Sequence, residues 1–200
     1  MRKKSETKRQ EILDIAANTF REFGFERTSM SQICSRVGGS KATLYSYFKS
    51  KEELFYEAIL VGEMKNFDVV TESLDNTSSN FVKSLYTFGV SFLTFLCMPI
   101  VNENRKLVIA ESRKSNLGVI VYENVIAKNQ KAIAEFLDKA VQTKQMRVAN
   151  TNIAAKHLIS LIKSEVEDEL LFGILKEIGS EQVKAMVKRA IDIFMAAYKI

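Results

Sequence analysis

Residues that break helices are scarce in this sequence: its 200 residues include one proline and eight glycines. Proline removes a backbone N–H and glycine adds conformational freedom, so a chain that is poor in both tolerates long helices. Apolar residues recur at spacings of three and four nearly throughout, which is the period of an amphipathic helix. The sequence therefore predicts an all-α protein, without internal repeats or low-complexity segments.

Residues with catalytic or metal-binding chemistry are also few. The single histidine, His157, has no acidic cluster beside it at metal-ligand spacing. The sequence contains neither a glycine-rich phosphate loop nor a nucleophile elbow. Cys34 and Cys97 stand apart in apolar patterns, which favours buried, reduced thiols; a redox sensor is the alternative. We therefore expect a protein that is not an enzyme and that uses no metal or cofactor.

Long hydrophobic runs are missing as well. The most apolar uncharged stretch covers residues 88–101, which is too short to cross a bilayer and is typical of a buried helix. The basic opening residues are not followed by the apolar stretch of a signal peptide. These absences predict a cytoplasmic protein without a membrane segment.

Acidic residues are absent from one stretch of the first quarter of the chain. The net charge is +5 and the isoelectric point is about 9.1. The acid-free stretch, residues 27–51, holds Arg27, Arg36, Lys41, Lys49 and Lys51. The opening nine residues hold Arg2, Lys3, Lys4, Lys8 and Arg9 against one acid, Glu6. A concentrated basic excess favours a polyanionic partner.

Caps and apolar faces predict where the helices begin and end. Ser29, Ser40 and Ser50 stand at N-cap positions, and Gln32 and Glu53 complete two capping boxes. Glycines at 24, 38 and 39 mark the turns between the first helices. The expected helices cover residues 5–23, 30–37, 41–48, 51–64, 80–98, 102–114, 118–144, 151–174 and 181–198. The expected domains are residues 1–60 and 61–200.

Two short helices joined by a glycine turn and flanked by a third form a helix-turn-helix, whose second short helix enters the major groove of DNA. In that helix Leu44 and Phe48 face inward, whereas Lys41 and Tyr45 share another face with Ala42 beside them. Lys41 can donate to a guanine edge, and Ala42 and Tyr45 can lie against a thymine methyl group. The side chains suited to phosphate oxygens are Ser40, Thr43, Ser46, Tyr47 and Lys51.

Several segments keep a fixed register along residues 8–60. They are residues 12–16, Phe20, residues 23–30, Ile33, Val37-Gly38, residues 40–45 and residues 48–54. In this register the stretch resembles the DNA-binding domain of the TetR/AcrR family of bacterial regulators. The sequence departs from the family at Cys34, where alanine is usual, at Gly39, where valine is common, and at Ser46, where a larger residue is frequent.

The resemblance implies roles for particular side chains at the DNA. Lys41, Ala42 and Tyr45 would approach bases, and Thr28, Ser40, Tyr47 and Lys51 would hold the backbone. The full expected DNA-binding set is Thr28, Ser29, Gly39, Ser40, Lys41, Ala42, Thr43, Tyr45, Ser46, Tyr47 and Lys51.

Residues 61–200 resemble the family's regulatory domain, and residues 104–113, 116–118 and Tyr122 look like an AcrR-like subgroup. The family implies a homodimer held by the last two long helices, and two-fold symmetry demands a palindromic operator. The apolar residues available for this contact are Leu158, Leu161, Ile162, Leu170, Phe172, Ile174, Val183, Met186, Val187, Ile191, Phe194 and Met195. The alternative is that these residues only fill the core of one protomer.

The middle helices are rich in aromatic and sulfur side chains, and a ligand pocket is largely apolar with a few polar groups. The expected pocket residues are Phe88, Phe92, Phe95, Met98, Tyr122, Phe136 and Glu165. The alternatives are that the aromatics form core and that Glu165 lies on a solvated face. If that carboxylate is buried beside aromatic rings, a cationic ligand becomes plausible.

These features together predict a sequence-specific DNA-binding transcriptional regulator. We expect a homodimeric repressor that a small apolar or amphipathic ligand releases from a palindromic operator, with the fourth helix as the lever between the domains. Two alternatives remain open: a helical interaction module without a DNA function, and a regulator that responds to a protein partner or to redox state.

Overall fold

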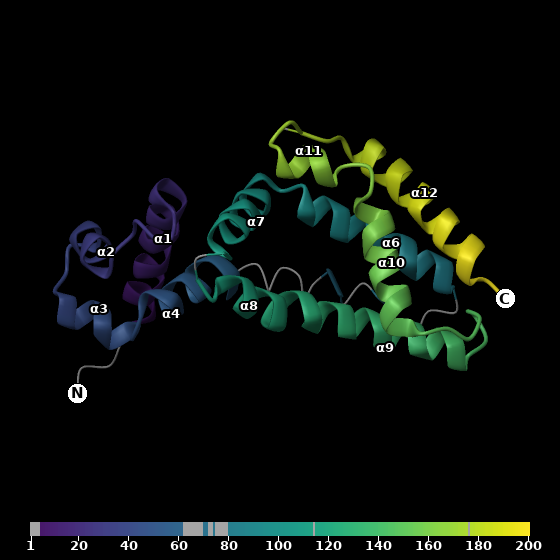
Figure 1. The fold of residues 1–200 in the computed structure, drawn as a ribbon, viewed down its shortest axis with the longest axis horizontal. Coiled ribbons are helices and arrows are strands. Elements are labelled where there is room, and N and C mark those ends of the chain that lie inside the picture. The colour runs from purple at the N-terminus through teal and green to yellow at the C-terminus, as the bar shows by residue number, and fades with distance from the viewer. Residues whose placement is uncertain (1–4, 62–69, 72–73, 75–79, 114, 176) are drawn as a thin grey trace. The chain divides into compact units, whose positions relative to one another are not determined.

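A computed structural model describes residues 5–61, 70–71, 74, 80–113, 115–175 and 177–200 (Figure 1). The chain divides into two compact units. The N-terminal unit comprises residues 1–65 and 103–121, and the C-terminal unit comprises residues 66–102 and 122–200. The predicted domain boundary at residue 60 assigns residues 103–121 to the C-terminal domain, whereas in the structure they belong to the N-terminal unit. We keep that division as a proposal for the extent of the DNA-reading part.

Every regular element in the described part of the chain is helical, so the predicted all-α class is confirmed. The elements are α1 (Glu6–Phe23), α2 (Met30–Val37), α3 (Lys41–Tyr47), α4 (Lys51–Phe55), the π-helical turn η1 (Tyr56–Val61), α6 (Phe81–Leu96), α7 (Pro99–Glu111), α8 (Leu117–Val121), the π-helical turn η2 (Tyr122–Ala127), α9 (Lys128–Gln142), α10 (Thr151–Lys163), α11 (Glu167–Leu171) and α12 (Ser180–Tyr198).

The predicted N-caps are confirmed by their hydrogen bonds. The hydroxyls of Ser29, Ser40 and Ser50 each accept a bond of 3.1 Å from the backbone N–H three residues later. Glu53 completes its box in a shifted form, because its carboxylate accepts the N–H of Lys49, one residue before the cap. Local side-chain chemistry thus determines where α2, α3 and α4 begin.

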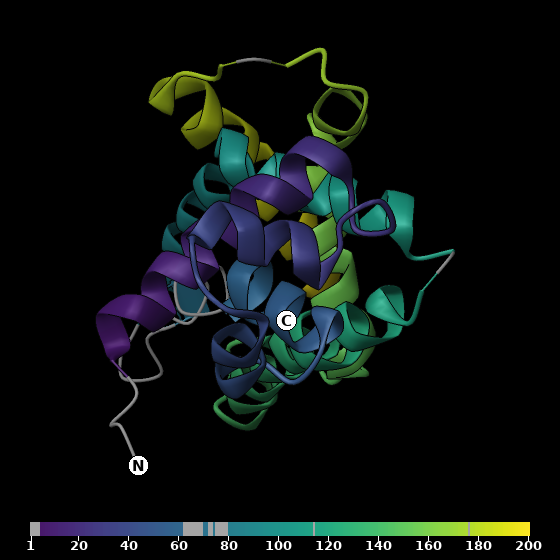
Figure 2. The same ribbon diagram turned by 90° about the vertical axis from the view of Figure 1, so that its left-hand side faces the viewer.

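The N-terminal unit is built around aromatic side chains from α1, α4 and the turn after α1. The rings of Phe20, Phe25 and Phe55 are fully buried, with centroids 5.0–5.9 Å apart. Val108 and Leu117 add apolar surface to this core from the segment 103–121. Figures 1 and 2 show α1, α2 and α3 from two directions, with α2 packed against both α1 and α3.

The C-terminal unit has its own core, in which α6, α9, α10 and α12 supply most of the buried side chains. Helix α10 packs against α9 and α12, and α12 also packs along α6. The approach of α6 to α12 is close at Gly89, where a Cβ would lie 2.6 Å from Cγ1 of Val187. Gly89 is therefore a packing position, at which a side chain would collide with the Val187 side chain of α12.

Some predicted helix boundaries were wrong. Pro99 begins α7 rather than separating two helices, because proline fits the first helical position, where its missing N–H is not needed. The predicted helix at 118–144 is divided into α8, η2 and α9, and that at 151–174 into α10 and α11. Residues 62–64 of the predicted fourth helix lie outside the described residues.

Among the described residues, no single helix is long and apolar enough to cross a membrane. Within the described part of the chain, one pair of helices, α6 and α7, meets that length and composition criterion together, and the two are bent by 71° from one another.

Candidate nucleic-acid interface

Most side chains of α3 are exposed, and a few are buried and fix the helix to the core. Leu44 and the following Phe48 are buried, as predicted, and Tyr45 is 49% exposed. Lys41 and Ala42 lie on the exposed part of the same short helix. Two side chains thus fix α3 to the core, while its remaining surface is available for contact with a partner.

The turn between α2 and α3 is held by its backbone and by one thiol. Gly38 has a left-handed φ of 70° and donates its N–H to the carbonyl of Cys34 at 3.1 Å. The buried Cys34 thiol donates to the carbonyl of Gly39 at 3.0 Å. A Cβ at Gly39 would meet nothing within 4 Å. Two of the three positions at which the sequence departs from the family pattern, Cys34 and Gly39, are therefore in direct contact.

The hydroxyls predicted to bind phosphates have internal contacts as well. Ser40 and Thr43 share a bond of 2.9 Å between their hydroxyls, and the hydroxyl of Ser46 donates to the carbonyl of Thr43 at 2.7 Å. All three residues are exposed. Each hydroxyl has one proton, so Ser46 and the donor of the Ser40–Thr43 pair must rotate out of these bonds to donate to a phosphate oxygen, which their exposure allows.

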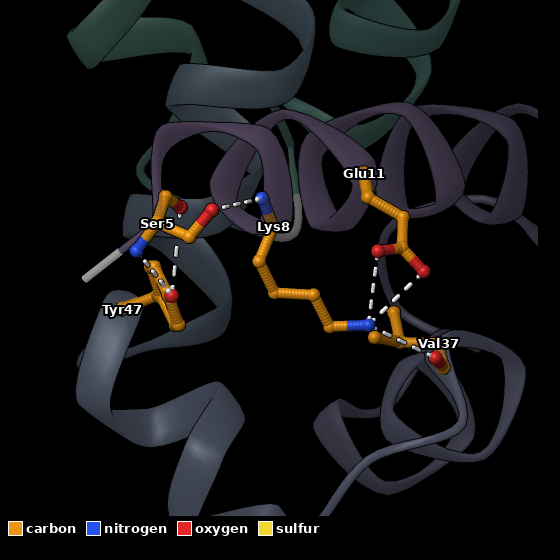
Figure 3. A network of polar contacts seen from close by, with 5 residues as sticks. All are labelled: Ser5, Lys8, Glu11, Val37 and Tyr47. Carbon is orange, nitrogen blue, oxygen red and sulfur yellow. Dashed lines mark hydrogen bonds and ion pairs between the residues drawn. The ribbon is translucent and has the colours of Figure 1, made fainter. Parts of the chain in front are cut away.

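Tyr47 joins α3 to the beginning of α1 (Figure 3). Its hydroxyl oxygen accepts the backbone N–H of Ser5 at 3.1 Å and donates to the carbonyl of the same residue at 3.5 Å. Close by, the Lys8 ammonium bonds to Glu11 at 3.0 Å and donates to the Val37 carbonyl at 3.4 Å. The first turns of α1 thus brace both the end of α2 and α3, an arrangement that no sequence motif indicated.

Thr28, Ser29 and Lys51 flank the helix pair and differ in exposure. Thr28 is 1% exposed, and its hydroxyl donates to the carbonyl of Gly24 at 2.7 Å, so it supports the turn after α1 from inside. Ser29 is exposed as the cap of α2. Lys51 is half-buried: its ammonium donates to the carbonyl of Phe25 at 3.0 Å and lies 4.2 Å from the centroid of that ring.

The basic side chains of residues 27–51 are not neutralised as a group. Among the described residues, only Arg36 of the five forms an ion pair, at 2.6 Å from Glu22. Its hydrogen bond lowers the pKa of Glu22, and the same bond raises the pKa of Arg36. Lys41 and Lys49 are exposed without an ion pair to a described residue. The surface around α3 is therefore positively charged.

Helix α7 contributes a polar contact to α1 and lies close to the turn that follows α1. Arg21 donates to Oδ1 of Asn104 at 2.9 Å, and Asn104 is buried. Oε1 of the buried Glu111 lies 3.0 Å from the position that a Cβ of Gly24 would take. Arg21 and Asn104 are 83 residues apart in sequence, so no local pattern predicted this contact.

The residues predicted to form a ligand pocket do not gather in one place. Four of them are buried in the core of the C-terminal unit: Phe88, Phe92, Phe95 and Phe136. The other three, Met98, Tyr122 and Glu165, are exposed. Glu165 forms two bonds to Arg189, at 2.8 and 2.6 Å, and the hydrogen bonding lowers the pKa of its carboxyl. It therefore lies on a solvated face and not beside the aromatic rings.

Most apolar residues considered for a dimer contact fill the core of one protomer instead. The buried ones are Leu158, Ile162, Leu170, Val183, Val187, Ile191 and Phe194. Leu161, Met186 and Met195 are partly buried against the same core. Phe172 and Ile174 are exposed, as are Ile153 on α10 and Ile193 on α12. The exposed faces of α10 and α12 thus retain apolar residues that the sequence pattern had not distinguished.

Histidine and cysteine occupy structural positions. Nδ1 of the exposed His157 is 2.7 Å from the hydroxyl of Tyr198, which joins α10 to the end of α12. Cys34 is buried and Cys97 is half-buried, and neither forms a disulfide. Among the described residues, no group of three or more His, Cys, Asp or Glu residues is arranged to hold a metal ion.

Comparison with known proteins matches the N-terminal and the C-terminal part of the chain to one domain family each. Residues 12–58 match the domain family described as bacterial regulatory proteins, tetR family. Residues 83–200 match the family described as AefR-like transcriptional repressor, C-terminal domain. The sequence had resembled an AcrR-like subgroup in this region; the family is confirmed, and the matched C-terminal domain is AefR-like.

Individual relatives agree with this assignment. The HTH-type transcriptional regulator YhgD of Bacillus subtilis (strain 168) is 25% identical over 136 residues, which are 66% of this chain and 65% of that protein. A TetR-family transcriptional regulator from Mesorhizobium loti MAFF303099 superposes with a TM-score of 0.85 at 22% identity, covering 98% of this chain and 100% of the other. The flavonoid-responsive regulator FrrA superposes with a TM-score of 0.81 at 24% identity, covering 98% of each chain.

The two structural likenesses show the fold, and the domain matches, which extend over more than half of the chain, show the family. Members of this family are regulators of transcription and not enzymes. The exposed helix α3, its capped start and the braced turn before it are the helix-turn-helix of that family. This chain belongs to the TetR family of bacterial transcriptional regulators.

Proposed function

We propose that this chain is a homodimeric repressor that binds a palindromic operator through α3 and that a small apolar or amphipathic ligand releases. The observation that carries the proposal is the exposed surface of α3, which presents Lys41, Ala42 and Tyr45 within an acid-free stretch. A short helix with a cation and apolar groups near its beginning fits the major groove. The site of action is the cytoplasm.

Each exposed side chain of α3 has a specific role in this proposal. Lys41 donates to a guanine edge, and Ala42 and the Tyr45 ring contact a thymine methyl group. Ser29, Ser40, Thr43 and Ser46 donate to phosphate oxygens around the helix pair, Ser46 after its proton turns away from the Thr43 carbonyl, with the backbone at Gly39 close to the DNA. Thr28 and Tyr47 hold the helices in place and do not contact DNA directly, because their hydroxyls are bonded to Gly24 and Ser5. Lys51 extends the cationic surface beside Phe25.

The homodimer in this proposal forms through the outward faces of α10 and α12. Ile153 and Ile193 are exposed there, and Ala196 and Ala197 leave room for a close approach on α12. One helix-turn-helix contacts only a few base pairs, so dimerisation supplies both affinity and the two-fold symmetry of the operator.

The ligand is proposed to bind the C-terminal unit, whose core is rich in aromatic rings. Phe88 and Phe92 stack with centroids 5.7 Å apart, and Phe81 and Phe136 stack at 5.6 Å. The name of FrrA describes a flavonoid-responsive regulator, which supports an aromatic, amphipathic ligand here. A ligand that prefers a conformation with displaced recognition helices lowers DNA affinity by its differential binding free energy. We propose that α4 transmits this conformational change between the ligand-binding and DNA-binding parts.

The test is selection of bound fragments from randomly sheared genomic DNA, followed by sequencing, at two salt concentrations. Recovery of a palindromic site, with an affinity that falls steeply as salt rises, would support the proposal. The Lys41→Ala variant should then bind with relaxed preference at one symmetric pair of positions. Weak binding only at low salt, without an enriched motif, would overturn it in favour of a helical interaction module.

A further inference from the structure

We propose that Asn102 is a hydrogen-bonding residue of the ligand site in the C-terminal unit. The ligand that it recognises carries a neutral donor, a hydroxyl or an N–H group, on an apolar body. This role rests on the proposed function, because it takes the C-terminal unit as the part that binds the ligand. Asn102 is 7% exposed and lies in the first turn of α7, within that unit.

The side-chain amide of Asn102 is oriented by one hydrogen bond. Its Nδ2 donates to the carbonyl oxygen of Leu170 at 2.9 Å, which joins the beginning of α7 to α11 (Figure 1). A carbonyl oxygen only accepts, so the amide nitrogen faces Leu170 and the amide oxygen takes the other position. That oxygen, Oδ1, is buried and accepts no hydrogen bond from the described residues.

The fold gains little from an asparagine at this position. The carbonyl of Leu170 also accepts the backbone N–H of Gly173 at 3.1 Å, so it does not depend on Asn102 for a donor. A buried acceptor without a donor is costly, because the hydrogen bonds that it made with water in the unfolded chain are not replaced. An apolar side chain would avoid this cost, which points to a use of Oδ1 other than packing.

Other buried polar side chains in the described part of this unit have partners. The hydroxyl of Thr151 donates to the carboxylate of Asp138 at 2.7 Å. The hydroxyl of Ser84 donates to the carbonyl of Asn80 at 3.4 Å. The unpaired oxygen of Asn102 is therefore not a general property of the polar groups in this core.

The chemistry of an amide oxygen limits the ligand. Oδ1 only accepts hydrogen bonds, so it binds a donor and not an anion. One neutral acceptor does not compensate a buried ammonium group for its lost hydration, which disfavours a cation. Val101 and Leu170, which adjoin Asn102, belong to the apolar core, so the rest of the ligand has to be apolar. A neutral molecule with one hydroxyl or N–H group on an apolar body meets these conditions.

The buried amide lies close to an exposed apolar segment. Helix α11 ends one residue after Leu170, and Phe172 and Ile174 follow with exposures of 81% and 71%. Gly173, between them, has a left-handed φ of 72° and bonds back to Leu170. Exposed apolar side chains of this size are suited to contact with an apolar ligand. We assign this segment as the side from which the ligand reaches Oδ1.

The probes are flavone and its monohydroxy derivatives, which share one apolar body and differ in one donor. Calorimetric titration measures their binding to the full-length wild type, to Asn102→Leu and to the control Thr151→Val. Leucine is close to asparagine in size and removes the acceptor, whereas valine removes a hydroxyl that is already bonded to Asp138.

We expect the wild type to bind the best hydroxyflavone about tenfold or more tightly than flavone, because flavone leaves a buried acceptor unpaired. Asn102→Leu should lose this preference and bind both probes about equally. Thr151→Val should keep it.

Urea unfolding without ligand separates recognition from folding. Asn102→Leu removes an unpaired buried acceptor and leaves Leu170 bonded to Gly173, so we expect it to be at least as stable as the wild type. A clearly less stable variant would show that the amide supports the fold, as it would if a buried water bridged it, and would overturn the role in recognition.

Failure of this role and failure of the proposed function give different results. Equal binding of flavone and its hydroxy derivatives by the wild type, or a preference that survives in Asn102→Leu, would overturn the role of Asn102 alone. A wild type that binds neither flavone nor any of its hydroxy derivatives would overturn the proposed aromatic ligand, and the role of Asn102 with it.

Discussion

The thiol of Cys34, on α2, donates a hydrogen bond to the carbonyl oxygen of Gly39 across the turn that leads into α3. Alanine, which is usual in the family at the first of these positions, cannot make this bond. We therefore expect Cys34→Ala to lower the free energy of unfolding by less than the ~0.5–1.5 kcal/mol of an ordinary hydrogen bond, because a thiol is a weak donor.

Cys34→Ser is the matched variant, because serine retains a donor of similar size. Urea unfolding of both variants, beside the wild type, measures the effect. Serine should be the more stable of the two, and an alanine variant as stable as the wild type would show that the bond contributes nothing to the turn.

A side chain at Gly89 should loosen the C-terminal unit. Its Cβ would lie 2.6 Å from Cγ1 of Val187 and 3.5 Å from Cδ1 of Ile162. Overpacking of this kind costs about 1–3 kcal/mol, whereas replacing a helical glycine by alanine gains only about 1 kcal/mol. We expect Gly89→Ala to lower the melting temperature. Adding Val187→Ala should cost less in that background than in the wild type, and a strictly additive pair would argue against the clash.

The ion pair between Glu22 and Arg36 should make stability depend weakly on pH. Arg36 lowers the pKa of Glu22 from its ordinary value of 4.5. The contribution is therefore fully present above the unfolded pKa and is lost as the pH falls through the lower, folded pKa. Glu22→Gln should be less stable than the wild type at neutral pH, and the difference should vanish well below pH 4.5. Both side chains are exposed, so the effect is small.

Denaturant unfolding over a series of pH values measures this difference. Glu26→Gln serves as the control, because Glu26 is exposed nearby and forms no ion pair with a described residue. A gap between wild type and Glu22→Gln that persists at low pH would exclude the ion pair as its origin.

Ile193 offers a direct test of the dimer. It is 57% exposed on α12, so Ile193→Glu should leave the protomer folded while placing a charge in the proposed contact. We expect a monomer by sedimentation and a large loss of operator affinity. Val148→Glu is the control, since Val148 is 84% exposed and lies between α9 and α10. An Ile193→Glu protein that remains dimeric would move the contact elsewhere.

Features of the fold that depend on neighbouring residues were predictable from the sequence. The caps at Ser29, Ser40 and Ser50 follow from bonds that span three residues, and the inward turn of Leu44 and Phe48 follows from helical spacing. Pro99 was misjudged because the same residue can end one helix or begin the next.

Features that depend on distant residues were not predictable. Nothing near Tyr47 in the sequence indicates that its hydroxyl meets Ser5, and nothing near Arg21 points to Asn104. Thr28 has a side chain suited to phosphate, and only its burial shows that the hydroxyl is used inside the protein. Helical spacing alone did not separate core aromatics from pocket walls, so the aromatic pocket residues remain a prediction.

The composition of the N-terminal unit limits how DNA specificity can be exchanged between regulators of this fold. A chimera joined at residue 60 would transfer the helix-turn-helix without Val108 and Leu117. It would also leave Arg21 without its hydrogen-bond partner Asn104. Such a graft would carry exposed apolar surface and an incomplete core. To keep the N-terminal core complete, residues 103–121 would have to be transferred with the first 60, because the compact unit that carries α3 is discontinuous in sequence.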